Sequence, residues 1–336
     1  MSVKSILVLT EVEIDTFFPE GRFEALKSLL GDCRVVDCRD MGAEEWRALL
    51  AEVNPKIIVA GWKMSRLPED ALREVCPHLK YVCYLAGSVR KVVPRSLIED
   101  GLLVSNWGAS ISRTIAECAL FLAISCCRNL AHWNRQMHDC GGWKDDTTTT
   151  RSLFEKRVGI HGYGSIARAL IALLKPFNCE LVVYSDGVPA EVFKADGVSS
   201  ADSVEDLFRD RDVVFELEAL IPERVKVVNE SLLRSMTRGG IFVNVARGEL
   251  VDEEALLRVV NDGHIKAGVD VYSVEPLPKD HPFRGCYDIV MLPHIAGPTT
   301  DRRRDAGDHA HDNVARFLNG EAVSSIVTTD IYDRST

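Results

Sequence analysis

The chain has 336 residues, of which 46% are apolar and 27% are charged, and its 50 acidic against 40 basic side chains give a net charge of −10. This composition is typical of a globular protein with room for two domains, and the acidic balance argues against binding to nucleic acid or to an anionic membrane surface. Ten cysteines without a C-x-x-C pair, an apolar run at 115–127 that is too short for a membrane span, and no secretory signal predict a cytoplasmic protein with reduced thiols and no bound metal.

Residues 1–104 alternate apolar strands with helices. We predict strands at 5–9, 35–36, 57–60 and 81–85, and helices at 22–30, 43–53 and 68–75. Such alternation predicts a parallel sheet, and ligands bind at the carboxyl ends of its strands. Trp62 and the loop Ala86-Gly87-Ser88 follow the third and fourth strands and are therefore candidate substrate-binding residues. For Trp62, a packing role beside a turn is an equally good interpretation.

The next segment leads into a second series of strands. A long helix is predicted over 110–135, with Ser110 as its N-cap. Residues 139–151 are expected to be irregular, because they contain Gly-Gly and four consecutive threonines. Two further strands are predicted at 158–160 and 181–184, with a helix between them.

A glycine-rich turn follows the first of these two strands. Gly162, Gly164 and Ala167 form G-x-G-x-x-A, in which the first position allows a tight turn, the second lets a pyrophosphate approach the backbone, and the third allows close helix packing. The helix from Ser165 directs free N–H groups at that phosphate. Asp186 lies about 20 residues further on, where a carboxylate binds a ribose 2′-hydroxyl and repels a 2′-phosphate. Because no Arg or Lys closely follows Asp186, we predict NAD rather than NADP; an ordinary turn with a solvated Asp186 is the alternative.

The alternation continues after Asp186. Strands are predicted at 213–217, 240–245, 265–271 and 289–292, and helices at 229–236 and 252–261. A polar helix at 300–318 carries apolar residues on one face and is expected to pack back on the first domain. The chain is therefore predicted to be an α/β protein with two doubly wound parallel sheets.

Three polar clusters follow three of these strands, at 244–248, 270–276 and 293–297. Because ligands bind at that edge of a parallel sheet, we expect Arg247, Glu275 and His294 to be catalytic. Arg grips a carboxylate and polarises a neighbouring carbonyl, His exchanges a proton near neutral pH, and a carboxylate orients the imidazole. Each residue alone has a structural alternative, such as an ion pair, a surface charge or a turn histidine, but their joint appearance favours catalysis.

From about Leu79 to Gly320 the chain resembles the D-isomer-specific 2-hydroxyacid dehydrogenase family, through VGIHGYGSIAR, NVARGELVDEEAL, AGVDVYSVEPLP and LPHIAGPT. The resemblance implies that a Rossmann NAD-binding domain, residues 106–297, is inserted into a flavodoxin-like substrate domain made of residues 1–105 and 298–336. It also implies hinges near Asn106 and Gly297, and a homodimer formed through the NAD-binding domain with a helical arm at 110–143.

The resemblance also implies roles for single residues. Arg247 binds the carboxylate and carbonyl oxygen of the substrate, His294 is the acid and base, and Glu275 hydrogen-bonds His294 and favours its charged form. Asp270 contacts the nicotinamide carboxamide. The predicted cofactor-binding residues are Gly162, Tyr163, Gly164, Ser165, Ile166, Asp186, Ala246 and Asp270, and the predicted substrate-binding residues are Trp62, Ala86, Gly87, Ser88 and Arg247.

Two segments depart from the family's pattern. Where the family's substrate loop ends in Gly-x-Asp-Asn, this chain has Arg90 and Lys91, from which we predict a substrate with a second anionic or polyhydroxy portion. Where the family has His and Pro beside the cofactor, residues 215–220 read FELEAL, and Glu216 and Glu218 are expected to weaken dinucleotide binding.

The sequence therefore predicts an NAD-dependent oxidoreductase that interconverts a small 2-hydroxy acid and its 2-keto acid, with His294 as acid and base. Glyoxylate, hydroxypyruvate, pyruvate and sugar-derived keto acids remain open as substrates. Two alternatives stay open as well. One is a dehydrogenase of another small anion such as phosphite, and the other is a dinucleotide-sensing scaffold like the C-terminal-binding-protein corepressors.

Overall fold

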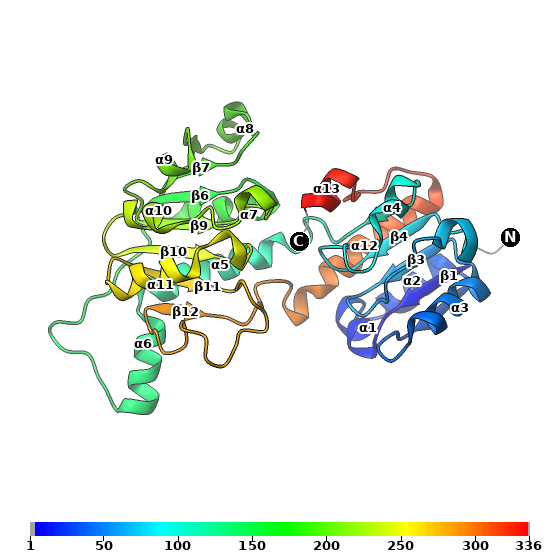
Figure 1. The fold of residues 1–336 in the computed structure, drawn as a ribbon, viewed down its shortest axis with the longest axis horizontal. Coiled ribbons are helices and arrows are strands. Elements are labelled where there is room, and N and C mark those ends of the chain that lie inside the picture. The colour runs from blue at the N-terminus through cyan, green and yellow to red at the C-terminus, as the bar shows by residue number, and fades with distance from the viewer. Residues whose placement is uncertain (1–3, 335–336) are drawn as a thin grey trace. The chain divides into compact units, whose positions relative to one another are not determined.

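The computed structural model describes residues 4–334, and the chain divides into two units (Figure 1). Unit 1 is Met1–Ile111 with Pro298–Thr336, and unit 2 is Ser112–Gly297. Unit 2 is thus inserted into the sequence of unit 1. The division proposed from the sequence lies a few residues earlier, at 105, whereas unit 2 begins with the first residue of helix α5 (Ser112–Cys127).

Unit 1 contains a five-stranded parallel sheet in the order β2-β1-β3-β4-β5, the flavodoxin-like order that was predicted. Its strands are β1 (Ser5–Val8), β2 (Cys33–Val36), β3 (Ile57–Ala60), β4 (Tyr81–Tyr84) and β5 (Leu103–Ser105). Its helical segments are α1 (Glu11–Phe17), α2 (Arg22–Leu30), α3 (Ala43–Val53), η1 (Ala71–Val75), α4 (Arg95–Glu99), η6 (Thr300–Arg302), α12 (Arg303–Asn319) and α13 (Thr329–Arg334). Every residue of β1, β3 and β4 is buried, as expected for parallel strands covered by helices.

The C-terminal helix α12 returns to unit 1, as predicted. It packs against α1, α2 and β4 and buries Ala306, Ala310 and Val314 in the core. Gly307 is required at the crossing with α1, because a Cβ there would lie 1.8 Å from the carbonyl oxygen of Phe17.

Unit 2 contains a seven-stranded parallel sheet in the order β12-β11-β10-β9-β6-β7-β8. Its strands are β6 (Arg157–His161), β7 (Glu180–Tyr184), β8 (Ser199–Ser200), β9 (Val213–Glu216), β10 (Gly240–Asn244), β11 (Ile265–Val269) and β12 (Ile289–Met291). Its helical segments are α5, α6 (Leu130–Arg135), η2 (Gln136–Cys140), α7 (Ser165–Leu174), η3 (Lys175–Phe177), α8 (Ala190–Ala195), α9 (Val204–Phe208), η4 (Pro222–Arg224), α10 (Glu230–Ser235), η5 (Gly248–Leu250) and α11 (Glu253–Asn261). The chain runs from β6 outward to β7 and β8, then returns to β9 on the other side of β6. This reversal is the Rossmann arrangement, and it creates a binding crevice at the carboxyl ends of β6 and β9.

The long helix predicted over 110–135 is wrong in two respects. It begins at Ser112 rather than at Ser110, whose hydroxyl instead donates to the carbonyl of Trp107. It also breaks after Cys127, because Asn129 adopts a left-handed conformation with φ of 53°. The segments on either side of the break are bent by 67°, and no single helix among the described residues is long and apolar enough to cross a membrane.

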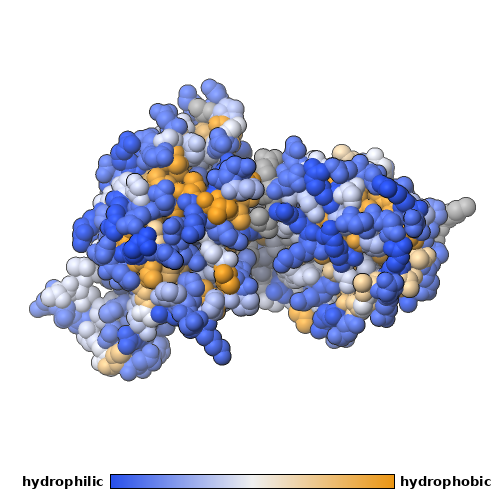
Figure 2. All heavy atoms as spheres, in the orientation of Figure 1, coloured by the Kyte–Doolittle hydropathy of each residue, from blue (hydrophilic) through white to orange (hydrophobic). Residues whose placement is uncertain are grey.

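Hydrophilic side chains dominate the visible face of each unit in Figure 2. The apolar residues of unit 2 gather instead on the two sides of its sheet. One group surrounds α5 and α7, and the other lies under α9, α10 and α11. The sheet is therefore buried on both faces, and its carboxyl edge is left to carry polar loops.

Candidate active site

The glycine turn after β6 has the geometry that a dinucleotide requires. Gly162 has φ of 93°, and a Cβ there would lie 2.7 Å from the backbone of Glu218, so the position accepts only glycine. Gly164 is the N-cap of α7, and a Cβ at Gly164 would meet no atom within 4 Å. The N-terminus of a ten-residue helix thus opens onto vacant space beside a bare backbone, which suits a pyrophosphate.

The side chains that flank the turn serve packing. The ring of Tyr163 contacts Phe193 edge-on at 4.7 Å between centroids, and its hydroxyl donates to the carboxylate of Asp196. Ile166 packs against the apolar core around α7. Ser165 lies in the first turn of α7, where its hydroxyl accepts a hydrogen bond of 2.7 Å from Ser112. Tyr163 and Ile166 therefore have only their backbone groups to offer a phosphate.

Arg247 follows β10 at the carboxyl edge of the sheet, in a loop that Asn244 holds. The buried Asn244 side chain accepts from the N–H of Ala246 at 3.0 Å and donates to the carbonyl of Arg247 at 2.9 Å. The guanidinium of Arg247 donates to the carbonyl of Ala246 at 2.6 Å. Burial lowers the pKa of Arg247, although the carboxylates of Glu249 and Glu275 oppose this shift.

The loop of Arg247 packs directly against the loop of Glu275. A Cβ on Gly248 would lie 1.9 Å from the carbonyl carbon of Tyr272, so the two backbones touch. The backbone N–H of Tyr272 in turn donates to Oε1 of Glu275 at 3.0 Å. Glycine at 248 thereby brings the Arg motif and the acid motif together.

His294 lies opposite Glu275. Its Nδ1 is 2.6 Å from Oε2 of Glu275, and the histidine adopts a left-handed backbone conformation with φ of 56°. An ionised carboxylate only accepts hydrogen bonds, so the pair places the proton on Nδ1 and turns Nε2 away from Glu275. Half of the His294 side chain is exposed, so Nε2 can meet a ligand. The structure thus brings together Arg247, Glu275 and His294 at one edge of unit 2.

Asp270 fixes the loop that carries His294. Its side chain is 1% exposed, and its two carboxylate oxygens accept from the N–H groups of Ile295 at 2.7 Å and Ala296 at 2.9 Å. Burial raises the pKa of Asp270, and these two backbone donors oppose the rise. The sequence predicts a contact with the cofactor; the structure adds a positioning role that the sequence did not reveal.

In unit 1, Trp62 and Gly87 lie beside a second tryptophan. Trp62 is 36% exposed, and its ring makes an edge contact with the ring of Trp107. The backbone N–H of Trp62 donates to the carboxylate of the buried Glu13 at 2.7 Å. A Cβ on Gly87 would lie 3.2 Å from the indole nitrogen of Trp107. The guanidinium of Arg303 lies over the Trp62 ring at 5.0 Å. Substrate binding by Trp62 and Gly87 stays a prediction, and the sequence did not indicate that Trp107 and Arg303 lie beside Trp62.

The rest of the predicted substrate loop is more enclosed. Ala86 is buried, and Ser88 is half-buried. Arg90 and Lys91 are both exposed, and the guanidinium of Arg90 lies over the ring of Tyr332 at 6.0 Å. The contact of Arg90 with α13 gives it a packing role, and its contact with a substrate stays a prediction.

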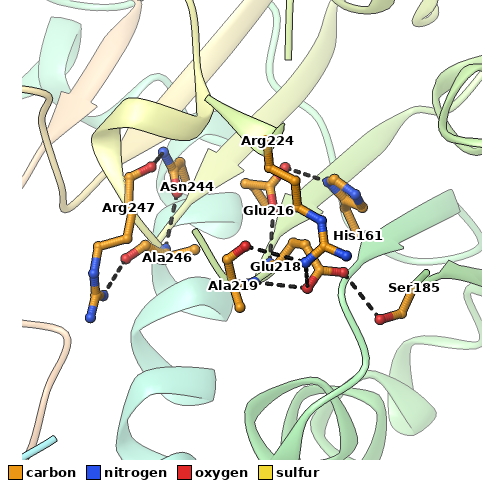
Figure 3. A network of polar contacts seen from close by, with 9 residues as sticks. All are labelled: His161, Ser185, Glu216, Glu218, Ala219, Arg224, Asn244, Ala246 and Arg247. Atoms are coloured by element: carbon orange, nitrogen blue, oxygen red, sulfur yellow. Dashed lines mark hydrogen bonds and ion pairs between the residues drawn. The ribbon is translucent and has the colours of Figure 1, made fainter. Parts of the chain in front are cut away.

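Glu216 and Glu218, which the sequence predicts to weaken dinucleotide binding, belong to a polar network (Figure 3), and their effect on binding stays a prediction. Glu216 is fully buried, and its Oε2 is 2.6 Å from Nδ1 of the equally buried His161. Glu218 accepts from the Ser185 hydroxyl at 3.1 Å and from Arg224 at 3.0 Å. Both carboxylates therefore have partners within unit 2.

Arg224 was missed as a neighbour of Asp186. It lies in η4, after β9, and its guanidinium is 3.7 Å from the carboxylate of Asp186. No cation follows Asp186 closely along the chain, as predicted, but one lies close to it in space. The sheet places β7 and β9 on the two sides of β6, and Arg224 follows β9.

Residues 120–296 match the model of the D-isomer specific 2-hydroxyacid dehydrogenase NAD-binding domain, which covers more than half of the chain. The chain belongs to this family. Unit 2 is accordingly its NAD-binding domain, and the open space above Gly164 with the carboxylate of Asp186 fits the cofactor NAD.

Individual relatives support the same assignment. The hydroxypyruvate reductase of Blautia hydrogenotrophica is 26% identical, over 88% of this chain and 92% of the relative. The D-3-phosphoglycerate dehydrogenase of Methanocaldococcus jannaschii is 26% identical over 84% of this chain, which spans only 53% of that relative. The solved structure of a D-2-hydroxyisocaproate dehydrogenase shares the fold with a TM-score of 0.82 at 22% identity, and the match covers 97% of this chain and all of that one.

The buried His161–Glu216 pair makes the stability of the NAD-binding domain depend on pH. Burial alone would lower the pKa of His161, but the Glu216 carboxylate outweighs burial and the pKa stands above its ordinary 6.5. This contribution is fully present below the unfolded pKa and is lost as pH rises through the folded pKa. We expect the free energy of unfolding of the wild type, relative to His161→Gln, to fall as the pH rises above about 6.5, the ordinary pKa of histidine. Urea unfolding measures this difference, and an increase with pH would contradict the assignment.

Asp270→Asn is expected to lower kcat about tenfold and the free energy of unfolding by about 1–3 kcal/mol. The amide oxygen replaces one acceptor, but the amide NH2 faces the second backbone N–H and leaves a buried donor without a partner. The His294 loop then loses its fixed position. Steady-state kinetics and urea unfolding measure both effects. Asp262→Asn, which removes an exposed carboxylate on the same unit, is the control, and equal effects in the two variants would rule out a positioning role.

Across residues 4–334 of the structure, no group of three or more His, Cys, Asp or Glu side chains is placed to hold a metal ion.

Proposed function

We propose that this protein reduces a small 2-keto acid to the D-2-hydroxy acid with NADH, and catalyses the reverse oxidation with NAD. The reaction is that of the family to which the chain belongs. The observation that carries the proposal is the His294–Glu275 pair next to the Arg247 loop, on the sheet edge where the glycine turn also opens.

Bound NADH supplies the hydride. Arg247 grips the substrate carboxylate and stabilises the negative charge that develops on the carbonyl oxygen. Nε2 of His294 delivers a proton to that oxygen in reduction and removes it in oxidation. Glu275 holds Nδ1, so that the ring keeps the required orientation and its charged form is stabilised.

The proposed substrates are glyoxylate and hydroxypyruvate. The support is that relatives of this chain carry the names hydroxypyruvate reductase and glyoxylate reductase. The test is NADH oxidation in the presence of glyoxylate, hydroxypyruvate or pyruvate. Phosphate, which is the product of phosphite oxidation, is the negative control. Oxidation of D-glycerate but not L-glycerate in the reverse direction is expected.

Two results would replace the proposal. Turnover of NAD with phosphite alone would favour dehydrogenation of another small anion. NADH binding without turnover of any keto acid would favour a dinucleotide-sensing scaffold. The keto-acid reaction is proposed because it is that of the family to which the chain belongs, and turnover decides between it and these two alternatives.

We also propose a homodimer formed through the NAD-binding domain. In Figure 1, α6 and the loop after it extend away from the sheet of unit 2. This arm exposes large apolar side chains, with Met137 at 52% and Trp143 at 72% exposure. Such surface is costly in water unless a partner covers it. Light scattering during gel filtration should give twice the mass of the chain, and Trp143→Ser with Met137→Ser should shift the protein toward the monomer.

We propose a cytoplasmic location. All ten cysteines are free, and most are buried or half-buried in apolar surroundings. Such thiols persist where the medium is reducing. Fractionation of the source cells with an antibody against the protein tests this, and recovery outside the cytoplasm would contradict it.

A further inference from the structure

Arg224 lies between two carboxylates at the end of β7. Its guanidinium donates to Oε1 of Glu218 at 3.0 Å and is 3.7 Å from Oδ2 of Asp186. The side chains of Arg224 and Glu218 are only 18% and 9% exposed, whereas Asp186 is 76% exposed. The arginine is thus anchored on its inner side by Glu218 and reaches outward to Asp186 (Figure 3 shows the inner contact).

This trio lies beside the cofactor turn. Gly162 lies directly against the backbone of Glu218, because a Cβ on Gly162 would be 2.7 Å from it. Ser185, which precedes Asp186, donates its hydroxyl to Glu218 at 3.1 Å. Glu218 therefore connects the glycine turn, the end of β7 and Arg224. Asp186 holds the position where a carboxylate binds the adenosine ribose of NAD.

Glu218 is itself held by hydrogen bonds with Glu216 and Ala219. Its N–H donates to Oε1 of Glu216 at 2.9 Å, and Glu216 is paired with His161 inside the sheet. The N–H of Ala219 closes the local structure by donating to Oε1 of Glu218 at 2.8 Å. A carboxylate fixed in this way keeps the Arg224 guanidinium in one place, rather than leaving it on a mobile side chain.

The charges decide what the trio can bind. Asp186 and Glu218 are acidic and Arg224 is basic, so the group carries one net negative charge. A lone arginine at this position is the usual partner of the 2′-phosphate of NADP. Here Glu218 already neutralises the guanidinium, and a 2′-phosphate would meet the remaining negative charge. The ribose hydroxyls of NAD meet no such repulsion.

We propose that Glu218 determines cofactor choice by holding Arg224 against Asp186, so that the site accepts NAD and rejects NADP. Glu218 and Arg224 are positioning residues, and Asp186 contacts the ribose. The inference rests on the proposed use of NAD, but it concerns binding of the adenosine half and needs no turnover.

The test compares Glu218→Gln with a matched control. Gln keeps the size of Glu218 and an oxygen for Ala219, but it removes the charge that neutralises Arg224. Glu223→Gln removes one exposed carboxylate from the residue next to Arg224 and leaves the trio intact. Dissociation constants for NADH and NADPH are measured by protein fluorescence. Those for 5′-AMP and 2′,5′-ADP are measured by calorimetry, because these two ligands isolate the 2′-phosphate.

In Glu218→Gln we expect NADPH and 2′,5′-ADP to bind about tenfold more tightly, because one unit of repulsion close to the phosphate is removed. NADH and 5′-AMP should change less than threefold, and Glu223→Gln should leave all four constants nearly unchanged. An unaltered NADPH-to-NADH ratio in Glu218→Gln, or an equal change in both variants, overturns the proposal. So does a wild type that binds both cofactors equally.

Arg224→Gln gives an independent reading. It leaves two carboxylates facing each other without their cation, so we expect NADH and 5′-AMP to bind about tenfold more weakly and NADPH to gain nothing. A tighter NADPH complex in Arg224→Gln would show that the charges of the trio do not govern binding of the 2′-phosphate and would overturn the role given to Glu218. If the affinities behave as expected but no keto acid is turned over, only the proposed reaction fails.

Discussion

His294→Gln is expected to lower kcat for keto-acid reduction by about 10²–10⁴-fold while leaving the dissociation constant of NADH within about threefold. Gln approximates the length of His and can still hydrogen-bond Glu275 at the position of Nδ1. It cannot release a proton to the carbonyl oxygen, so the developing alkoxide must take its proton from water. The loss should fall on the chemical step, because the proposed mechanism places His294 against the substrate and not against the adenosine half of the cofactor.

His264→Gln is the matched control for this prediction. His264 directly precedes β11, so it lies at the amino end of that strand, opposite the end that Asp270 follows. Its Nε2 contacts the carbonyls of Arg234 and Met236 at 3.0 and 3.1 Å. This variant should lose stability but keep kcat. A His294→Gln enzyme with at least one third of the wild-type kcat would remove His294 from the mechanism and revive the scaffold interpretation.

The parts of the site that the sequence predicts are those encoded within one short segment. The glycine turn needs a tight bend and a bare backbone within a few residues, and Gly162 and Gly164 meet both needs. Arg247, Glu275 and His294 each follow a strand, and parallel strands bring their carboxyl ends to one edge without further information. Periodicity and topology together are therefore enough for this prediction.

The parts that the sequence does not predict depend on which loop folds over which. Arg224 reaches Asp186 only because the loop after β9 turns back across the end of β6, and no pattern along the chain shows that turn. The role of Asp270 was incomplete for the same reason, since its partners are backbone N–H groups that any residue could supply. The helix break at Asn129 is a single left-handed residue in an otherwise helical pattern.

The FELEAL segment shows how a departure from a family pattern can be compensated. Two acidic residues beside an anionic cofactor are unfavourable when considered alone. In the structure, Glu216 is paired with His161, and Glu218 with Arg224. These four residues come from three segments, namely β6, the end of β9 and η4, so the pairing was visible only after folding. The expected weakening of dinucleotide binding stays a prediction, and the pairing adds an expected preference between dinucleotides.

Arg247→Gln is expected to lower kcat/KM for keto acids by about 10²–10³-fold, the usual cost of removing a donor that stabilises an oxyanion. The guanidinium of the half-buried Arg247 donates to the carbonyl of Ala246 at 2.6 Å, and the Asn244 side chain holds the backbone carbonyl of Arg247. Gln retains neither the charge nor the fork that matches a carboxylate. We expect KM to rise and kcat to fall, because in the proposed mechanism Arg247 binds both the substrate carboxylate and the developing alkoxide.

Arg247→Lys separates charge from geometry. Lys keeps the positive charge but presents it as a point, so we expect it to recover part of the kcat lost in Arg247→Gln and little of the KM. Arg258→Gln, which removes an exposed guanidinium from α11, controls for net charge and should leave both constants unchanged. NADH affinity is measured on all three proteins. If Arg247→Gln weakened NADH as much as the keto acid, the guanidinium would belong to the cofactor site, and its proposed role in binding the substrate carboxylate would be wrong.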